Sequence, residues 1–377
     1  MVPAPLSRSS TPLAPAAQAS ATTRSASRRW RARTRRHTKA SATGALLLAL
    51  LGAPGCYYAH LAAGQARLLL ARRPLDAALT DATLEPGLRE RLALVREVRA
   101  FAPSLGLRLG GQYTSYAEWP GDRVVTTVVA TRPGEIEAAG FRFPIVGKVP
   151  YKGFFDAARA NAEAARLRAR GLDVCVVPVP AYSTLGWFDD PVTTPLLRLP
   201  PGKLVETLLH ELVHATVFAE SAARFNEGVA TFVGQEAALR FFAEREGPDA
   251  AREEERVGES RAVLDVLGRL RTAIAELYAG PAVPARDHAR AALTEAARAA
   301  LAALPLRLGD PARLARDAEL GDACLALVGT YQADLPAYAE RLGVLGGDLA
   351  GFLAEAGRAA REPDPRAALL GAAPAPR

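Results

Sequence analysis

Apolar residues recur every three or four positions over much of the chain, which is the spacing of an amphipathic helix. In the first half this pattern predicts helices at residues 57–70, 88–101 and 156–170, and Gly171 stands where the last of these should end. After Pro200 nearly every segment has helical spacing. There we expect helices at residues 203–219, 226–244, 253–278 and 285–304, with two more beyond Asp310.

Three segments have the character of strands instead. Residues 123–131 are rich in β-branched side chains, and residues 141–151 form a second apolar run that Pro144 and Pro150 interrupt. The third run, residues 173–180, contains two prolines, which confine it to the edge of a sheet because proline has no N–H to donate. The sequence therefore predicts an α+β fold, a small mixed sheet followed by a mainly helical half.

Charge is concentrated at the start of the chain. The chain has 47 Lys and Arg against 40 Asp and Glu, a formal net charge of +7. Nine of the basic residues and no acidic residue fall within residues 1–55, which leaves 38 basic against 40 acidic residues beyond them. The body of the protein is therefore close to neutral, and nucleic-acid binding, which depends on clustered Lys and Arg, loses its main support. We expect a leader at residues 1–55, one domain at 56–360 and a flexible tail at 361–377.

The leader has the features of an export signal. Its basic segment is followed by an apolar run at residues 44–51, far shorter than the roughly 20 residues that span a bilayer as a helix. Small residues then precede Cys56, an order that resembles the lipobox of bacterial lipoproteins, in which the cysteine is lipidated. The alternative is an ordinary cleaved signal or an uncleaved anchor.

The lipobox interpretation predicts an exported protein, attached by lipid to a membrane of the cell envelope and facing the periplasm. Such a compartment permits a disulfide between the two remaining cysteines, Cys175 and Cys324. Two buried free thiols are an equally good expectation at this point.

The helix expected at residues 203–219 contains an H-E-x-x-H segment formed by His210, Glu211 and His214. Residues four apart share one face of a helix, so both imidazoles can reach one metal ion. Glu211 can then face a water on that metal and take its proton, since zinc lowers the pKa of such a water to about 7. The alternative is a pair of incidental helix histidines, but the uninterrupted amphipathic helix around the motif favours zinc.

A catalytic zinc site needs a third protein ligand. Glu227 follows His214 after 12 intervening residues, and we expect it in the first turn of the next helix, with Asn226 as the N-cap. Alternatively, Glu227 only stabilises the positive end of that helix. The substitute ligands are Glu236, further along the same helix, and His288, the remaining downstream histidine.

Peptide hydrolysis also needs a donor for the oxyanion that develops on the carbonyl. Tyr182 is the candidate for this role, and Tyr331 is the second choice. The edge strand expected beside the metal helix is where a peptide substrate would add as a further strand. Asp189 and Asp190 could hold a substrate's amino group, although an Asp-Asp-Pro turn explains them equally well.

Several segments resemble a family of bacterial envelope proteins described as predicted aminopeptidases. Besides the H-E-x-x-H motif, the similar segments are Cys56-Tyr57-Tyr58 and residues 64–65, 71–75, 143–147, 151–155, 179–191 and 225–232. The resemblance covers residues 56 to 360 and implies a gluzincin-like zinc metallopeptidase that is a lipoprotein. It thus implies zinc-dependent hydrolysis of peptide or protein substrates in the cell envelope, of aminopeptidase type. The alternative is a non-catalytic zinc-binding envelope lipoprotein.

Overall fold

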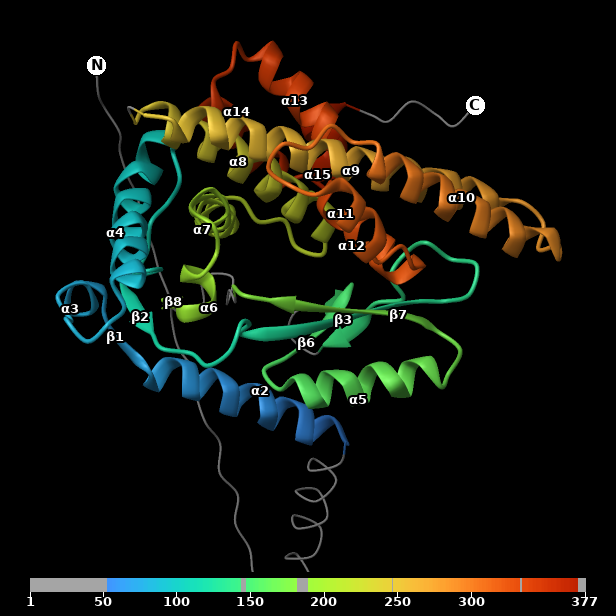
Figure 1. The fold of residues 1–377 in the computed structure, drawn as a ribbon, viewed down its shortest axis with the longest axis horizontal. Coiled ribbons are helices and arrows are strands. Elements are labelled where there is room, and N and C mark those ends of the chain that lie inside the picture. Colours follow the sequence, from blue (N-terminus) through green and yellow to red (C-terminus); the bar gives the residue numbers. More distant parts are fainter. Residues whose placement is uncertain (1–52, 144–146, 182–188, 246, 333, 372–377) are drawn as a thin grey trace, which may run out of the picture. The chain divides into compact units, whose positions relative to one another are not determined.

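Short strands and helices alternate in the first half of the molecule, and helices make up the described second half (Figure 1). The computed structural model describes residues 53–143, 147–181, 189–245, 247–332 and 334–371. From Ala53 onward the chain forms one compact unit. The fold is α+β, as the patterning predicted. No helix of the described residues is long and apolar enough to cross a membrane.

The elements of the first half are α2 (Ala53–Leu70), β1 (Arg72–Pro74), α3 (Leu75–Leu79), α4 (Pro86–Phe101), the 3₁₀ turn η1 (Ala102–Leu105), β2 (Ser115–Ala117), β3 (Val125–Thr131), β4 (Phe141–Phe143), β5 (Gly147–Val149), β6 (Tyr151–Phe154), α5 (Ala157–Arg168), β7 (Asp173–Val179) and β8 (Val192–Thr193). The elements of the second half are α6 (Thr194–Leu197), α7 (Pro201–Thr216), α8 (Ala223–Ala243), α9 (Asp249–Ala279), α10 (Ala285–Ala302), α11 (Pro311–Asp317), α12 (Asp322–Gln332), α13 (Leu335–Val344), α14 (Leu349–Ala359) and α15 (Pro365–Leu370).

β3 is the middle strand of an antiparallel sheet with the order β6-β3-β7. All of its residues are buried, because α5 covers one face of the sheet and α12 lies on the other. Side chains on a strand alternate between faces. Val128 and Ala130 accordingly pack in the cluster of α5, whereas Val129 packs with Ala323 of α12. β7 lies at the sheet edge, as the prolines of residues 173–180 predicted; Pro178 is within the strand and Pro180 follows its end.

The remaining strands form two smaller sheets. β1 pairs antiparallel with β2, which pairs parallel with β8, so this sheet is mixed. β4 and β5 form an antiparallel pair. The single strand expected at residues 141–151 is therefore wrong: that segment contains the β4–β5 pair and the first residue of β6.

α7 and α8 pack along each other inside the largest apolar cluster. α7 buries Leu204, Leu208 and Leu212, which recur at helical spacing. α8 consists largely of apolar and small residues on all sides and is buried nearly throughout. A Cβ on Gly234 of α8 would lie 3.0 Å from the carbonyl oxygen of Glu206 and 3.2 Å from the Cβ of His210. Glycine at this position therefore allows the two helices their close approach.

Cys175 of β7 and Cys324 of α12 form a disulfide, with 5.1 Å between their Cα atoms. The sequence had left this pairing open, because 149 positions separate the two residues.

The end of the chain differs from the pattern-based expectation. Five helices, α11 to α15, follow Asp310 among the described residues, where two were expected. α15 lies within the segment expected as a tail, and its Leu369 is buried in the largest cluster. Short helices with prolines at their starts carry too few turns for periodicity to reveal them.

Candidate metal centre

His210, His214 and Glu227 come together at the junction of α7 and α8. The Nε2 atoms of the two histidines are 3.2 Å apart. The Oε2 atom of Glu227 lies 3.3 Å from Nε2 of His210 and 3.5 Å from Nε2 of His214. The three side chains are between 5% and 16% exposed, so the cluster lies at the boundary between core and solvent.

This triangle fits a tetrahedral zinc ion. Zinc binds imidazole nitrogen and carboxylate oxygen at about 2.0–2.2 Å, so two ligand atoms of a tetrahedral site lie about 3.3–3.5 Å apart. The three separations match that range to within about 0.1 Å. Among the described residues, no further His, Cys, Asp or Glu belongs to the group. Three protein ligands are typical of catalytic zinc, whereas structural zinc takes four.

The connection between α7 and α8 is held by Asn226. Its side-chain amide donates to the carbonyl oxygen of Ala219 and accepts the N–H of the same residue, both at 2.8 Å. α8 begins at Ala223, so the expectations that Asn226 caps the helix and that Glu227 lies in its first turn are wrong. Glu227 lies in the second turn, where the macrodipole has weakened, and that removes the main alternative explanation for this carboxylate.

The charges within the cluster depend on one another. Burial alone would raise the pKa of Glu227, but hydrogen bonds to His210 and His214 outweigh it and hold that pKa well below its usual range. Burial likewise lowers the pKa of His214, yet the hydrogen bond to Glu227 and the charges of Glu227 and Glu211 raise it overall. Without a cation, the carboxylate of Glu227 is therefore held negative and favours a proton on His214. A divalent cation would take the place of that proton, because histidine binds metals in its neutral form.

Three tyrosines lie close to the carboxylates of Glu211 and Glu227. The pKa values of Tyr113, Tyr151 and Tyr331 are all raised, first by burial and then by the negative charge of Glu211, of Glu227 or of both. The ring of Tyr331 is stacked on that of His210, with 6.2 Å between centroids. Each phenol therefore keeps its proton at neutral pH and can act as a hydrogen-bond donor.

Sequence reasoning named only one of these three tyrosines. Tyr331 was the second choice for the oxyanion donor, whereas the first choice, Tyr182, lies outside the described residues. Tyr113 has a φ of 61°, which is uncommon for a bulky residue, and its N–H donates to the carbonyl oxygen of Asp190. Tyr151 stands in one of the family-like segments, but no spacing pattern marks it as a site residue.

The substitute ligands lie elsewhere. Glu236 pairs with Arg261 at 2.9 Å and with Arg240 at 3.7 Å. His288 is exposed on α10 and is not part of the cluster. The carbonyl oxygen of Asp189 accepts a hydrogen bond from Arg72, consistent with a structural role for that turn.

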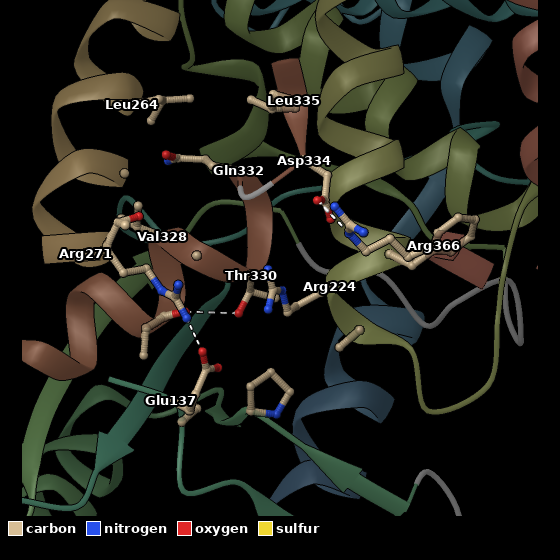
Figure 2. A pocket seen from close by; sticks show the side chains of 18 of the residues that line it. Glu137, Arg224, Leu264, Arg271, Val328, Thr330, Gln332, Asp334, Leu335 and Arg366 are labelled. Atoms are coloured by element: carbon tan, nitrogen blue, oxygen red, sulfur yellow. Dashed lines mark hydrogen bonds and ion pairs between the residues drawn. The ribbon is translucent and has the colours of Figure 1, made fainter. Parts of the chain in front are cut away.

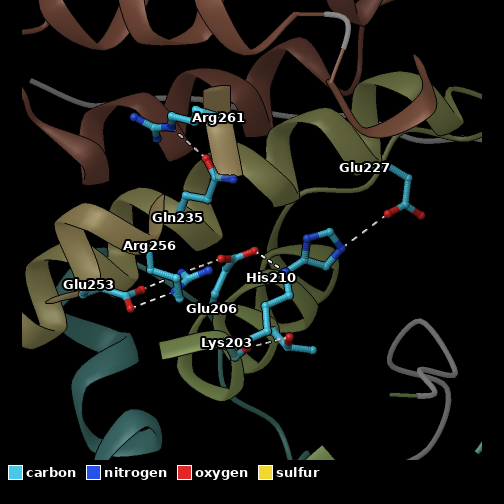
Figure 3. A network of polar contacts seen from close by, with 9 residues as sticks. Lys203, Glu206, His210, Glu227, Gln235, Glu253, Arg256 and Arg261 are labelled. Atoms are coloured by element: carbon cyan, nitrogen blue, oxygen red, sulfur yellow. Dashed lines mark hydrogen bonds and ion pairs between the residues drawn. The ribbon is translucent and has the colours of Figure 1, made fainter. Parts of the chain in front are cut away.

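A partly buried ionic network anchors α7 on the side away from Glu227 (Figure 3). Glu206, one turn before His210, binds Lys203 and Arg256, each at 2.6 Å. Arg256 also binds Glu253, which is buried on α9. α7 is thereby tied to α9 by charged groups that the metal cluster does not use.

A separate cavity of about 1450 Å³ lies between the start of α8, α9 and α12 (Figure 2). It is lined by sequence neighbours of the site, such as Phe225, but by none of the three clustered residues. Its ionic side chains largely pair with one another, as Arg271 does with Glu137 and Arg366 with Asp334. The cavity is therefore not assigned to the metal chemistry.

Comparison with known proteins identifies one related group. A family model described as "Putative aminopeptidase" matches residues 56–370. No curated protein and no solved structure matches the sequence significantly.

Proposed function

Because the chain belongs to the putative aminopeptidase family, we propose that it is a zinc-dependent peptidase of the cell envelope that uses the cluster at the α7–α8 junction. The observation that carries the proposal is the three-ligand set of His210, His214 and Glu227, spaced as tetrahedral zinc requires. A structural zinc site would call for a fourth protein ligand, and the described residues offer none at this cluster, which argues against a non-catalytic zinc lipoprotein.

Zinc bound there would polarise the scissile carbonyl and make a water acidic enough to lose its proton at neutral pH. Glu211 follows His210 directly on α7 and is partly exposed. Its carboxylate takes the proton of the attacking water and passes it to the leaving amine. Tyr331, whose phenol stays protonated beside His210, donates a hydrogen bond to the oxyanion.

The test is a zinc-dependent cleavage assay on the soluble form, residues 57–377, against a library of peptides with free and blocked amino termini. Glu211→Gln should keep one zinc per chain and lower turnover by about 10²–10⁴-fold, the usual value of general-base assistance. Undiminished peptidase activity in Glu211→Gln would refute the assignment. A preference for free amino termini would identify an aminopeptidase.

The proposed location rests on two cysteine features. A disulfide such as Cys175–Cys324 persists in oxidising, exported compartments and is rare in the cytosol. Cys56 lies in α2 directly after the small residues of the lipobox-like segment. Cys56→Ser should move the protein out of the membrane fraction. Mass spectrometry of the native protein that finds no lipid on Cys56 would exclude the lipoprotein proposal.

A further inference from the structure

α12 is attached to the edge strand β7 at two points. Cys324 in its first turn is bonded to Cys175, the third residue of β7. Asp173, the first residue of β7, accepts the N–H of Ala323 on Oδ2 at 2.8 Å. A side-chain oxygen at this position satisfies one of the free N–H groups at the start of a helix. The start of α12 is therefore held both covalently and by a hydrogen bond.

The other end of the same helix reaches the metal centre. Tyr331 follows Cys324 by seven residues, which is about two turns, so both side chains lie on one face of α12. At one end that face is bonded to β7, and at the other the ring of Tyr331 stacks on His210. Fixing the start of α12 therefore fixes the position of Tyr331 along the helix axis and its rotation about that axis, relative to His210.

A small apolar cluster joins the disulfide to Tyr151. Val129, Cys175 and Ala323 form its buried centre, and Tyr151, Cys324 and Leu327 are among the residues packed against it. β3 and β7 are already paired along their length, so within this cluster the disulfide adds a covalent bond between the sheet and α12.

The metal-binding residues are held by different means. α7 and α8 belong to the largest core cluster, and their junction is fixed by Asn226 and Gly234. Neither helix takes part in the attachment of α12 to β7. Loosening that attachment should therefore displace Tyr331 and leave the zinc ligands in place.

We propose that the Cys175–Cys324 disulfide, together with Asp173, is a clamp that positions Tyr331 against the metal centre. The catalytic part of this inference rests on the proposed peptidase function. Asp173, Cys175 and Cys324 are positioning residues: they act on the oxyanion donor through α12 and touch neither substrate nor metal.

The first test compares the wild-type protein with Cys175→Ala/Cys324→Ala. The double variant should keep one zinc per chain and a similar KM, while kcat falls by up to the 10²–10³-fold that loss of one oxyanion donor costs. Adding Tyr331→Phe to this variant should change kcat little further, since both changes remove the same interaction. A full additional loss would mean that the disulfide acts independently of Tyr331 and would overturn the proposal.

A second test needs no activity. Amide hydrogen exchange should accelerate at residues 322–332 in the double variant and stay unchanged at 201–243. The same comparison on folded wild-type protein reduced with a phosphine covers the case in which the variant does not fold. Unchanged exchange in α12 would refute the clamp. If the wild-type protein cleaves no peptide while exchange in α12 accelerates, the peptidase function fails and the clamp stands.

Asp173 has a matched control elsewhere in the fold. Asp310 caps α11 in a similar way, with Oδ1 accepting the N–H of Ala312 at 2.9 Å. Both Asp173→Ala and Asp310→Ala should lower stability by the amount usual for a lost cap, but only Asp173→Ala should lower kcat. Equal kcat in the two variants would contradict the role of Asp173.

Discussion

The side chain of Asn226 forms two hydrogen bonds with the backbone of one residue, Ala219, and so closes the turn between the two helices of the candidate metal centre. Glu227 is the next residue, and its carboxylate is the only part of the cluster that α8 contributes. The direction of Glu227 therefore depends on a pair of buried hydrogen bonds to a loop.

Asn226→Ala should weaken both folding and zinc binding. It leaves the N–H of Ala219 without a partner and the carbonyl of Ala219 with only the long bond from the N–H of Ala222 at 3.4 Å. A buried polar group left unpaired costs about 1–3 kcal/mol. Calorimetric titration with zinc and chemical denaturation measure the two effects. Asn161→Ala, an exposed position on α5, is the control and should change stability by less than about 0.5 kcal/mol. Unchanged zinc affinity in Asn226→Ala would show that the loop does not position Glu227.

Loss of a residue that only hydrogen-bonds to a metal ligand lowers metal affinity by about 10–100-fold. Glu227→Ala removes the ligand itself, so it should lower zinc affinity by more than that. Glu236→Ala is the matched control: it lies on the same helix, binds Arg261 and contacts no histidine of the cluster. Its zinc affinity should stay near that of the wild type. Competition against a fluorescent chelator measures the zinc affinity of both variants. If Glu236→Ala lost more affinity than Glu227→Ala, Glu236 would be the ligand.

Gly234→Ala should push α7 away from α8, since the new Cβ would lie 3.0 Å from the Glu206 carbonyl oxygen and 3.2 Å from the His210 Cβ. Overpacking of this kind costs about 1–3 kcal/mol, and the shift of His210 should also reduce zinc affinity. Gly258→Ala, in the middle of α9, is the control because a Cβ there meets nothing within 4 Å. It should raise stability by up to about 1 kcal/mol. A Gly234→Ala protein as stable as the wild type would mean that this contact is not close in solution.

The partly buried ionic network should make stability depend on pH. Burial alone would raise the pKa of Glu206, but Lys203 and Arg256 outweigh it and lower that pKa overall. A carboxyl group with a lowered pKa in the folded state stabilises the protein above its unfolded pKa of about 4.3, and this stabilisation is lost as pH falls through the folded pKa. Urea denaturation between pH 7 and pH 3 should show that loss.

In Glu206→Gln the loss below pH 5 should be smaller, and stability at pH 7 should already be reduced. Removing one partner of a buried pair costs about 3–5 kcal/mol, and we expect the lower end because Arg256 keeps Glu253. The control is Glu135→Gln, whose exposed pair with Arg132 should contribute less than about 1 kcal/mol. Parallel pH profiles for wild type and Glu206→Gln would contradict this account.

The sequence by itself determined the features that depend on local spacing. Two histidines four residues apart must share a helix face, so the pairing of His210 with His214 followed from the helical period. The prolines of residues 173–180 excluded that run from the middle of a sheet, and β7, which contains Pro178, is an edge strand. Amphipathic spacing located the long helices to within a few residues, whereas the short helices after Asp310 lacked the turns to show a period.

Only the tertiary structure decided which distant groups join the histidines. Glu227 and Glu236 lie on the same helix, and the sequence between them and His214 does not determine which one faces the histidines. The close packing at Gly234 and the hydrogen bonds of Asn226 to the loop determine that it is Glu227. Tyr331, more than a hundred residues beyond His210, reaches it because α12 crosses the sheet. The pairing of Cys175 with Cys324, which secures that crossing, depends on the same packing. Such contacts result from how whole elements pack, and no local pattern of residues encodes them.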